Sequence, residues 1–501
     1  MNTTLNSRVA LSWPDSPPVS TRFDDTEPLR RLYFLDFPLL LLSVGLLTWI
    51  LPTDTMLFIS ALTGAAVGVY TLWEIVIRRE PLRISHIFCV ANTVGYGLGV
   101  VNSWLGISRG SLALAEFFNR DTVAVAQAMA AILIASGILY SLGELYDPPL
   151  FKKNFRLTLD NRAAAFIAFG TALLIVGFAT GKLGYMGSTA AVNNGHLGFL
   201  GELLSWISPT TFAFSVLCFL EWPKGMVKWF LGVMLAVQFI LIIPTGRRSL
   251  IYFVLLGLIA TRFGSFKARW SFAKKIVYVA IVAGLIGVSA TAFFYLRYAS
   301  WGKHHVSLAD RIALAVDLYE SGDTGKANQS LRENLVKRTF VLGYVSDLLD
   351  ASFRMKPAEG GNALHEFQLV IPSALWADKS TFLYSEESVA NMTYHFAYVD
   401  EANSLYSAGA IDFGIWGMIL YPIIVAALFR IVAGLIKVNL PDVVAVLVIL
   451  YFVYVALITE AGLWMRLLTI RDSVIYAGFL WAFFSIPAIR LKRRPQEGAL
   501  S

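Results

Sequence analysis

Three arginines stand where the chain is expected to enter or leave an apolar segment: Arg247, Arg248 and Arg297. A guanidinium group stays charged, and its planar donors can bind two oxygens of a phosphate at once. Several such groups at one membrane surface predict a binding site for an anionic headgroup such as a diphosphate. The alternative is that these side chains simply extend from helix ends to lipid headgroups.

Candidate proton acceptors are concentrated in the long stretch that follows Arg297. Histidine titrates near neutral pH and is a frequent general base, so His304, His305 and His365 are candidates for taking a proton from an attacking hydroxyl. Further acceptors in this stretch are Glu366, His395, Asp400 and Glu401. For each of these residues the alternative is an exposed loop position or a helix cap.

Four other residues are candidates for binding a substrate. Trp301 and Tyr406 could stack on sugar rings, while Glu401 and Arg466 could add polar contacts to the same outer pocket. The alternatives are aromatic anchors at the membrane interface and, for Arg466, mutual neutralisation with the neighbouring Glu460.

Composition places these residues in a membrane protein. Of 501 residues, 56% are hydrophobic and 15% are charged, whereas soluble domains have about 25% charged residues. Apolar blocks recur at the length that a helix needs to cross a bilayer, so we expect an all-α polytopic membrane protein with about twelve spans. The expected spans are 35–51, 56–77, 84–107, 123–142, 163–180, 206–220, 229–243, 250–261, 276–295, 411–436, 443–457 and a twelfth that ends before Arg490.

Basic residues set the expected orientation, because Lys and Arg clusters remain on the cytoplasmic side. Such clusters lie in 78–83, 152–156, 262–275 and 490–494. Both termini are then cytoplasmic tails, and Arg247 and Arg248 face outward. The resulting division is a tail at 1–31, spans one to nine within 32–297, a large periplasmic loop at 298–405, spans ten to twelve within 406–490, and a tail at 491–501.

The large outer loop is expected to be partly helical. Apolar residues recur at three- and four-residue spacing in 310–319 and 329–349, which is typical of amphipathic helices. We expect these helices to lie over the membrane domain.

Several classes of function are disfavoured. The net charge of +7 comes from clusters between apolar blocks, so it predicts contact with membrane lipids and not with nucleic acid. Cys89 and Cys218 fall inside expected spans, where they would pack in the core. No metal-ligand spacing, phosphate-binding glycine loop or nucleophile elbow occurs, so we expect no metal and no cofactor.

Two short segments resemble a known family. Thr-Gly-Arg-Arg-Ser-Leu at 245–250 precedes an apolar helix, and Glu-Ala-Asn-Ser-Leu-Tyr at 401–406 leads through Asp-Phe-Gly-Ile-Trp-Gly at 412–417 into span ten. Together with the span count and the loop position, they resemble the O-antigen polymerase (Wzy) and oligosaccharide repeat-unit polymerase families, in the superfamily of the O-antigen ligases. Arg248 stands where the family pattern has glycine, so we take both arginines as candidates.

The resemblance implies a multi-pass enzyme of the bacterial inner membrane that acts in O-antigen or exopolysaccharide biosynthesis. It would transfer a glycan from undecaprenyl diphosphate to a sugar hydroxyl of another lipid-linked repeat unit at the periplasmic face. The implied partners are undecaprenyl-diphosphate-linked oligosaccharide, a chain-length regulator and a flippase. Arginines in a dry pocket would stabilise the leaving diphosphate, so this glycosyltransferase would need no metal.

Two other functions fit the same span pattern. A ligase-like glycosyltransferase would differ from a polymerase in its acceptor, and no residue of this chain identifies a sugar. A flippase for lipid-linked oligosaccharides, or another transporter, should have polar residues along a path through its spans. The expected spans are mostly apolar at their centres, which favours the polymerase.

Overall fold

The computed structural model describes residues 27–78, 80–107, 121–147, 149–151, 155–179, 198–223, 225–243, 247–264, 308–321, 340–372, 375–376, 384–398 and 403–485, with isolated positions in 274–298 and at 325 and 401. Throughout these residues every regular element is a helix, and no strand occurs among them. The all-α class expected from the sequence is confirmed.

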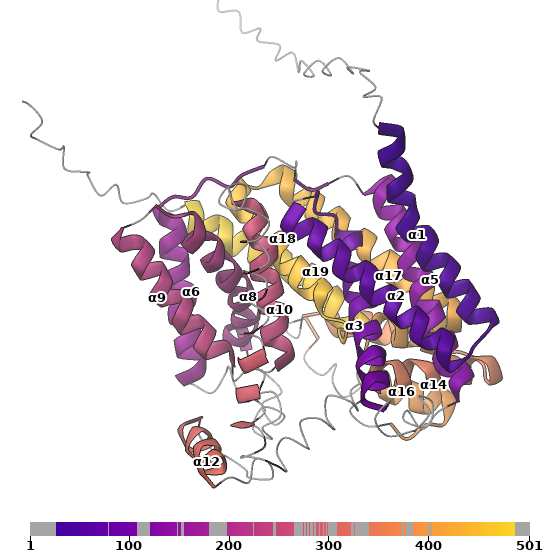
Figure 1. The fold of residues 1–501 in the computed structure, drawn as a ribbon. Coiled ribbons are helices and arrows are strands. Elements are labelled where there is room, and N and C mark those ends of the chain that lie inside the picture. The colour runs from indigo at the N-terminus through magenta and orange to yellow at the C-terminus, as the bar shows by residue number, and fades with distance from the viewer. Residues whose placement is uncertain are drawn as a thin grey trace, which may run out of the picture.

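The bundle has two groups of helices with a third group between them (Figure 1). The first group contains α1 (Glu27–Ile50), α2 (Asp54–Trp73) with the π-helical turn η1 (Glu74–Arg78), α3 (Ile84–Ile107) and α5 (Thr122–Tyr146). The second contains α6 (Asn161–Ala179), α8 (Gly198–Glu221), α9 (Met226–Ile242) and α10 (Arg247–Ala260) with the short η3 (Thr261–Phe263). Between them lie α17 (Leu405–Asn439), α18 (Asp442–Leu457) and α19 (Leu463–Ser485).

Seven helices of the described part are long and apolar enough to cross a membrane. They are Asp54–Arg78, Ile84–Val101, Thr122–Tyr146, Asn161–Ala179, Gly201–Glu221, Leu405–Asn439 and Leu463–Ser485. Shorter apolar helices occupy Asp36–Ile50, Met226–Ile242, Ser249–Phe263 and Asp442–Leu457. The chain is therefore a membrane protein. The expected span at 276–295 is described only in part, so the arrangement with about twelve spans stays a prediction.

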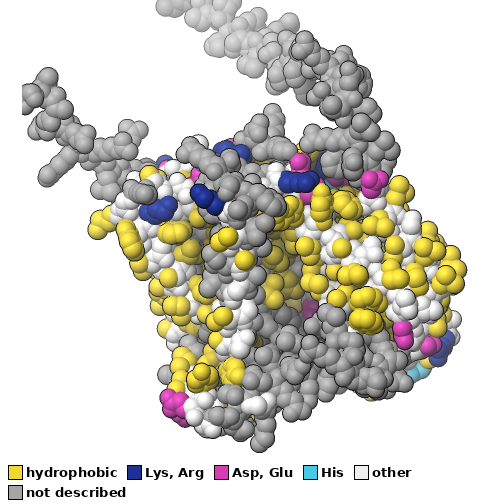
Figure 2. Space-filling model, in the orientation of Figure 1, with side chains coloured by type: hydrophobic (Ala, Val, Ile, Leu, Met, Phe, Trp, Pro, Cys, Tyr) yellow, Lys and Arg dark blue, Asp and Glu magenta, His cyan; other side chains and the backbone are white. Residues whose placement is uncertain are grey.

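The outside of the bundle is apolar, as a bilayer requires. Figure 2 shows hydrophobic side chains over the middle of one face, whereas most of the visible Lys and Arg side chains gather along its upper edge. Exposed leucines on α1 and exposed Trp229 on α9 belong to this apolar surface. In water such a surface would drive aggregation, but in a bilayer it contacts acyl chains.

The two ends of the bundle differ. α1 and α5 run antiparallel, since Gly45 lies against Ala130 and Gly137 lies against Pro38. The start of α1 and the end of α5 therefore share one end, which we call the terminal face. At the other end, Trp49 of α1 packs against Phe353 with ring centroids 6.2 Å apart, and we call this end the loop face.

Short helices from the expected outer loop lie at the loop-face end of the bundle (Figure 1). They are α12 (Leu308–Glu320), α14 (Phe340–Arg354), α15 (Gly361–Val370) and α16 (Glu386–Tyr394). Both expected amphipathic stretches coincide with helices here, α12 for the first and α14 for the second, although residues 329–339 lie outside the described part.

Helix α17 is broken near its start, where a continuous span was expected. Phe413 (φ −141°, ψ 19°) and Gly414 (φ 57°, ψ −137°) leave the helical conformation, and a positive φ favours glycine because it has no Cβ. The two parts of α17 then approach so closely that a Cβ added to Gly409 would lie 2.3 Å from the carbonyl carbon of Gly417.

The broken backbone finds its hydrogen bonds in the loop-face layer. The amide groups of Ala358 and Glu359 donate to the carbonyl oxygens of Ile411 and Asp412, each over 2.9 Å. The Tyr394 hydroxyl donates to Ala410 O (3.1 Å) and Ile411 O (3.2 Å). Since unpaired backbone groups are costly inside a membrane protein, the break and the layer that covers it stabilise one another.

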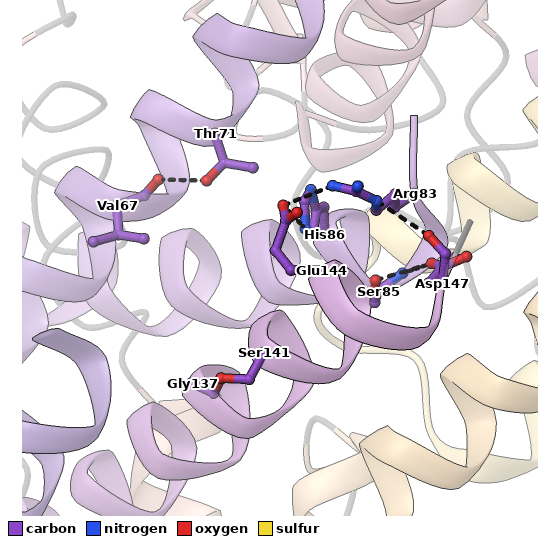
Figure 3. Close-up of polar contacts among 9 residues, drawn as sticks. All are labelled: Val67, Thr71, Arg83, Ser85, His86, Gly137, Ser141, Glu144 and Asp147. Carbon is purple, nitrogen blue, oxygen red and sulfur yellow. Dashed lines mark hydrogen bonds and ion pairs between the residues drawn. The ribbon is translucent and has the colours of Figure 1, made fainter. Parts of the chain in front are cut away.

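A partly buried network of charges lies at the terminal face (Figure 3). Arg83 at the start of α3 bonds Glu144 of α5 (2.6 Å), and His86 lies 3.1 Å from the same carboxylate. Asp147 accepts from the Ser85 hydroxyl (2.9 Å) and pairs with Arg430 of α17 (2.5 Å). Each charge has an opposite partner, so the network ties three helices together at this face.

Candidate active site at the loop face

Most of the arginine and histidine side chains predicted for the site lie outside the described residues. This holds for Arg297, Trp301, His304 and His305, and for the side chains of Arg247 and Arg248. The backbone of α10 nevertheless places its first residue. Phe263 O, at the other end of this segment, accepts from Leu157 N (3.1 Å), next to the terminal face, so the helix begins toward the loop face.

The start of α10 lies beside the end of α18. The rings of Phe253 and Tyr454 are 5.4 Å apart, and Arg247 precedes Phe253 by roughly 9 Å along the helix. The chain leaves α18 three residues after Tyr454 and turns through 458–462 into α19. The predicted arginine pair and this turn are therefore neighbours in the fold.

Arg466 is buried inside the turn and has a structural role. Its guanidinium group donates to the carbonyl oxygens of Val455, Ile458 (2.5 Å) and Ala461 (3.4 Å), and it lies 5.0 Å from the centre of the Phe88 ring. A cation that binds the last carbonyl groups of α18 caps this helix and complements its dipole. The prediction that Arg466 binds substrate gains no support from these contacts.

Tyr406 lies in the core, away from any surface on which a sugar could stack. It is 1% exposed and packs edge to face against Tyr96 of α3, with ring centroids 5.6 Å apart. Glu401 is half-buried just before α17. Of the predicted substrate-binding residues, Glu401 alone is described at a partly accessible position.

His365 lies on α15, next to Glu366. Its ring packs edge to face against Tyr384, with centroids 5.5 Å apart. Its Nδ1 atom is buried and has no hydrogen-bond partner among the described residues. The neighbouring Glu366 points toward α19, where one carboxylate oxygen accepts from the amide of Trp464 over 2.5 Å.

A second buried carboxyl group meets Glu366 at the start of α19. Glu386 of α16 is 3% exposed and Glu366 is 4% exposed, and the two carboxyl groups interact with one another. A Cβ added to Gly462 would lie 3.3 Å from both Glu386 Oε2 and Asn403 Cβ. Glycine at this position therefore lets α16 and the start of α17 approach the turn.

Burial and mutual repulsion keep one proton on this pair near neutral pH. Burial raises the pKa of Glu366 to about 7. Burial and the neighbouring Glu366 carboxylate raise the pKa of Glu386 well above its usual range. Two adjacent carboxyl groups out of water cannot both ionise easily. Near neutral pH Glu386 therefore retains its proton, while Glu366 can gain or lose its own.

The carboxyl pair lies below the end of α3, inside the bundle. Ser404 begins α17 and accepts from the Tyr96 hydroxyl (2.9 Å), and Thr459 in the turn donates to Ala91 O (3.0 Å). Tyr96 lies roughly 18 Å along α3 from its first residue. The chain segments on either side of the pair thus reach into the membrane domain from the loop face.

This arrangement can take a proton from a hydroxyl group. A carboxylate with a pKa near the working pH is an effective general base, and the exclusion of water strengthens its electrostatic effect. Among the described residues no group of three or more His, Cys, Asp or Glu side chains could hold a metal ion. The geometry of the pair supports acid–base chemistry.

Sequence reasoning named Glu366 among several acceptors but missed Glu386. The sequence Ser385-Glu386-Glu387 reads as an ordinary helix start, and Ser385 does accept from Ser388 N (3.3 Å). Twenty residues separate the two glutamates, so no spacing rule connects them. The sequence shows only that both glutamates lie in the same long loop, and this signal is too weak to predict that their carboxyl groups meet.

Fold and site together define an all-helical membrane protein with a buried acid–base pair beneath the helical layer of its loop face. Comparison with protein-family models, with curated proteins and with solved structures finds no match.

Proposed function

We propose that this chain is a polymerase of lipid-linked oligosaccharide repeat units at the periplasmic face of a bacterial inner membrane. The observation that supports it best is the buried Glu366 and Glu386 pair at the loop face, which offers a base of near-neutral pKa out of bulk water. The family resemblance of 245–250 and 412–417 supplies the reaction class.

In this proposal the chain has about twelve spans and two cytoplasmic termini. The terminal face is cytoplasmic and the loop face is periplasmic, in keeping with the positive-inside rule. The start of α10 and the turn at 458–462 then lie side by side toward the periplasm. The lipid-linked donor would reach them from the outer leaflet.

The reaction forms one bond and breaks one. Glu366 accepts the proton of an acceptor sugar hydroxyl, and the oxygen attacks the anomeric carbon of the donor glycan. The bond from this carbon to the diphosphate oxygen breaks, and undecaprenyl diphosphate leaves with the electron pair. Arg247, Arg248 and Arg297 stabilise the developing negative charge, and the captured proton later passes to water.

A glycan length profile in cells tests the proposal. Cells in which this gene is deleted should lose long polymer and accumulate single lipid-linked repeats on the periplasmic side. The wild-type gene should restore the polymer, and Glu366→Gln should not, because an amide cannot accept the proton. The matched control is Glu359→Gln, which removes an exposed carboxylate of the same layer that pairs with Lys356 (3.1 Å).

Other outcomes identify other functions. Intact long polymer that remains on its lipid carrier indicates a ligase, and repeats trapped on the cytoplasmic leaflet indicate a flippase. If Glu366→Gln restores the full polymer as well as Glu359→Gln does, Glu366 is not the base.

A further inference from the structure

The helix that positions Glu366 has no strong cap of its own. α15 has ten residues, and an isolated helix of this length is unstable in water. Its N-cap is Gly360, with φ 90° and no side-chain hydrogen bond. The conformation of α15 must therefore depend on groups supplied by other elements.

Asp412 supplies the missing cap from the break in α17. Its Oδ1 accepts from Asn362 N (2.8 Å) and its Oδ2 from Ala363 N (2.9 Å). The Tyr421 hydroxyl also donates to Oδ2 over 2.6 Å. A carboxylate at the first amide groups of a helix satisfies unpaired donors and complements the helix dipole.

Arg471 of α19 binds the opposite end of α15. Its Nη1 donates to the carbonyl oxygen of Val370, the last residue of the helix, over 2.8 Å. A cation at the last carbonyl groups is the counterpart of an acid at the first amide groups. α15 is thus bound at each end by the charge that its dipole favours.

Arg471 is itself held in place from a third helix. Its Nη2 lies 2.7 Å from Asp472 Oδ1, and Asp472 Oδ2 accepts from the indole of Trp206 in α8 (3.1 Å). Arg471 also lies 3.9 Å from Glu202 Oε1 of α8. Asp412 is held by the hydrogen bond from Tyr421, which lies in the part of α17 after the break. Both end contacts of α15 therefore connect to helices of the membrane domain.

From this geometry we propose that Asp412 and Arg471 are positioning residues, which hold α15 by its two ends and so keep Glu366 against the start of α19. The inference rests on the proposed function, in which Glu366 is the base. Glu366 lies four residues after Asn362 and four before Val370, so movement of either end displaces its carboxyl group. Loss of either contact would admit water around Glu366 and shorten the time that it spends beside Trp464 N.

The break in α17 allows Asp412 to reach the start of α15. A continuous helix would place position 412 on the side of a rod, with no access to the first amide groups of another helix. The turn at Phe413 and Gly414 exposes the end of the 405–412 segment to residues 358–363. The Asp-Phe-Gly sequence at 412–414 is then a device that presents a carboxylate to α15.

Four variants of the full-length protein in lipid nanodiscs test the inference. Asp412→Asn and Arg471→Lys alter the two end contacts with little change in volume. Tyr421→Phe is milder, because it removes one donor to Asp412 and leaves both amide contacts. The matched control is Arg354→Gln, which breaks the exposed Arg354 and Asp350 pair of α14 (2.9 Å) in the same layer.

The first measurement is hydrogen–deuterium exchange of residues 361–370, which needs no substrate. Loss of a hydrogen bond to a charged group should raise the exchange rate of α15 amides about tenfold in Asp412→Asn and Arg471→Lys. Tyr421→Phe should give a smaller rise, and Arg354→Gln should exchange as the wild type does. Wild-type exchange in all three end-contact variants would overturn the inference.

The second measurement separates positioning from mere stability. Infrared titration of the Glu366 carboxyl band, assigned by its loss in Glu366→Gln, should have a midpoint near 7 in the wild type. The groups that face Glu366 are Glu386 of α16 and Asp412 of α17. Water entry should lower the midpoint in Arg471→Lys and, less, in Tyr421→Phe, toward the ordinary value of 4.5. In Asp412→Asn the loss of the Asp412 charge lowers it as well, so Arg471→Lys is the decisive variant. An unchanged midpoint would leave these residues with a structural role only.

Chain elongation on lipid-linked repeats extracted from the deletion strain gives the last readout. Elongation should need the ionised base, so its rate should rise with pH through about 7 in the wild type. In the end-contact variants the maximum rate should fall and the rise should move to lower pH. If the exchange and infrared results hold but the wild type elongates nothing, the positioning stands and the proposed function fails.

Discussion

At the scale of single residues, burial has opposite consequences for Arg466 and for Glu366. The Arg466 guanidinium donates to three carbonyl oxygens, so its charge is compensated by helix ends that also need a partner. Glu366 accepts a hydrogen bond from Trp464 N but shares its environment with a second acid, so its charged form is compensated only in part. A fully compensated buried charge stabilises a fold, whereas one that is compensated only in part can serve in proton transfer.

Arg247 and Arg248 give the prediction that belongs to this scale. Lysine keeps the positive charge but lacks the planar fork that binds two phosphate oxygens. If the chain is the proposed polymerase, Arg247→Lys and Arg248→Lys should each lower the elongation rate about a hundredfold, the usual effect of losing one donor to a developing oxyanion. The readout is the length profile of the glycan in cells, together with immunoblots for insertion.

The control for these two variants is Arg354→Lys, at an exposed position of α14 that pairs with Asp350. It should leave chain length unchanged. Normal polymer from both Arg247→Lys and Arg248→Lys would remove the arginine pair from the site, whatever the fate of Glu366.

The sequence predicts the chemical role of a single residue from its type, but it does not predict which distant residues pack against it. Glu366 and His365 were recognised as proton acceptors because their types allow it. The partner of Glu366 was not, because Glu386 reaches it through the packing of α15, α16 and the turn at 458–462. For Tyr406 the residue type suggested a sugar platform, but three-dimensional packing places it 1% exposed in the core.

At the scale of elements, the break in α17 decides how the loop face is built. Apolar periodicity predicted a continuous span over 411–436, and a glycine inside an apolar segment does not by itself indicate a break. The break depends on groups distant in sequence, Ala358, Glu359 and Tyr394, which bind the carbonyl oxygens that it frees. The motif at 412–417 was recognised as a family resemblance, and its conformation was not predictable.

Gly414 gives the prediction for this element. Its φ of 57° is unfavourable for any side chain, and an added Cβ would lie 2.8 Å from Ser352 Oγ. Gly414→Ala should therefore destabilise the protein by about 1–3 kcal/mol and lower its melting temperature in detergent. Gly414→Ala should also raise the hydrogen–deuterium exchange rate of the α15 amides. Asp412, which accepts from the first amide groups of α15, lies only two residues before Gly414.

A second glycine provides the control for Gly414→Ala. Gly478 lies within α19 with no atom within 4 Å of an added Cβ, and alanine is the better helix former. Gly478→Ala should leave the melting temperature unchanged or raise it slightly. Equal melting temperatures for the two variants would show that the break tolerates a side chain, and that Asp412 is presented in some other way.

At the scale of the whole molecule, the apolar blocks predicted the helices well. Ten of the expected spans up to 457 overlap described apolar helices, and their ends differ by up to eight residues. Hydrophobicity succeeds because the bilayer imposes one length on every spanning helix. It predicted α12 and part of α14 at the loop face but not α15 and α16, whose positions depend on contacts with α17 and α19.

The orientation of the molecule carries the last prediction, because every proposed role depends on which face meets the periplasm. An alkaline phosphatase fusion at Ala327 should be active and a fluorescent protein fused there dark, since only the first folds in the periplasm. Fusions after Ser501 should give the reverse pattern. The basic clusters at 262–275 and 490–494 favour this orientation by about 1 kcal/mol per Lys or Arg near an anionic leaflet. A cytoplasmic signal at Ala327 would place the Glu366 and Glu386 pair on the side where lipid-linked repeats are made. The proposed polymerase would then be excluded. The contacts at the two ends of α15 would not be affected, because they do not depend on which side of the membrane the loop face meets.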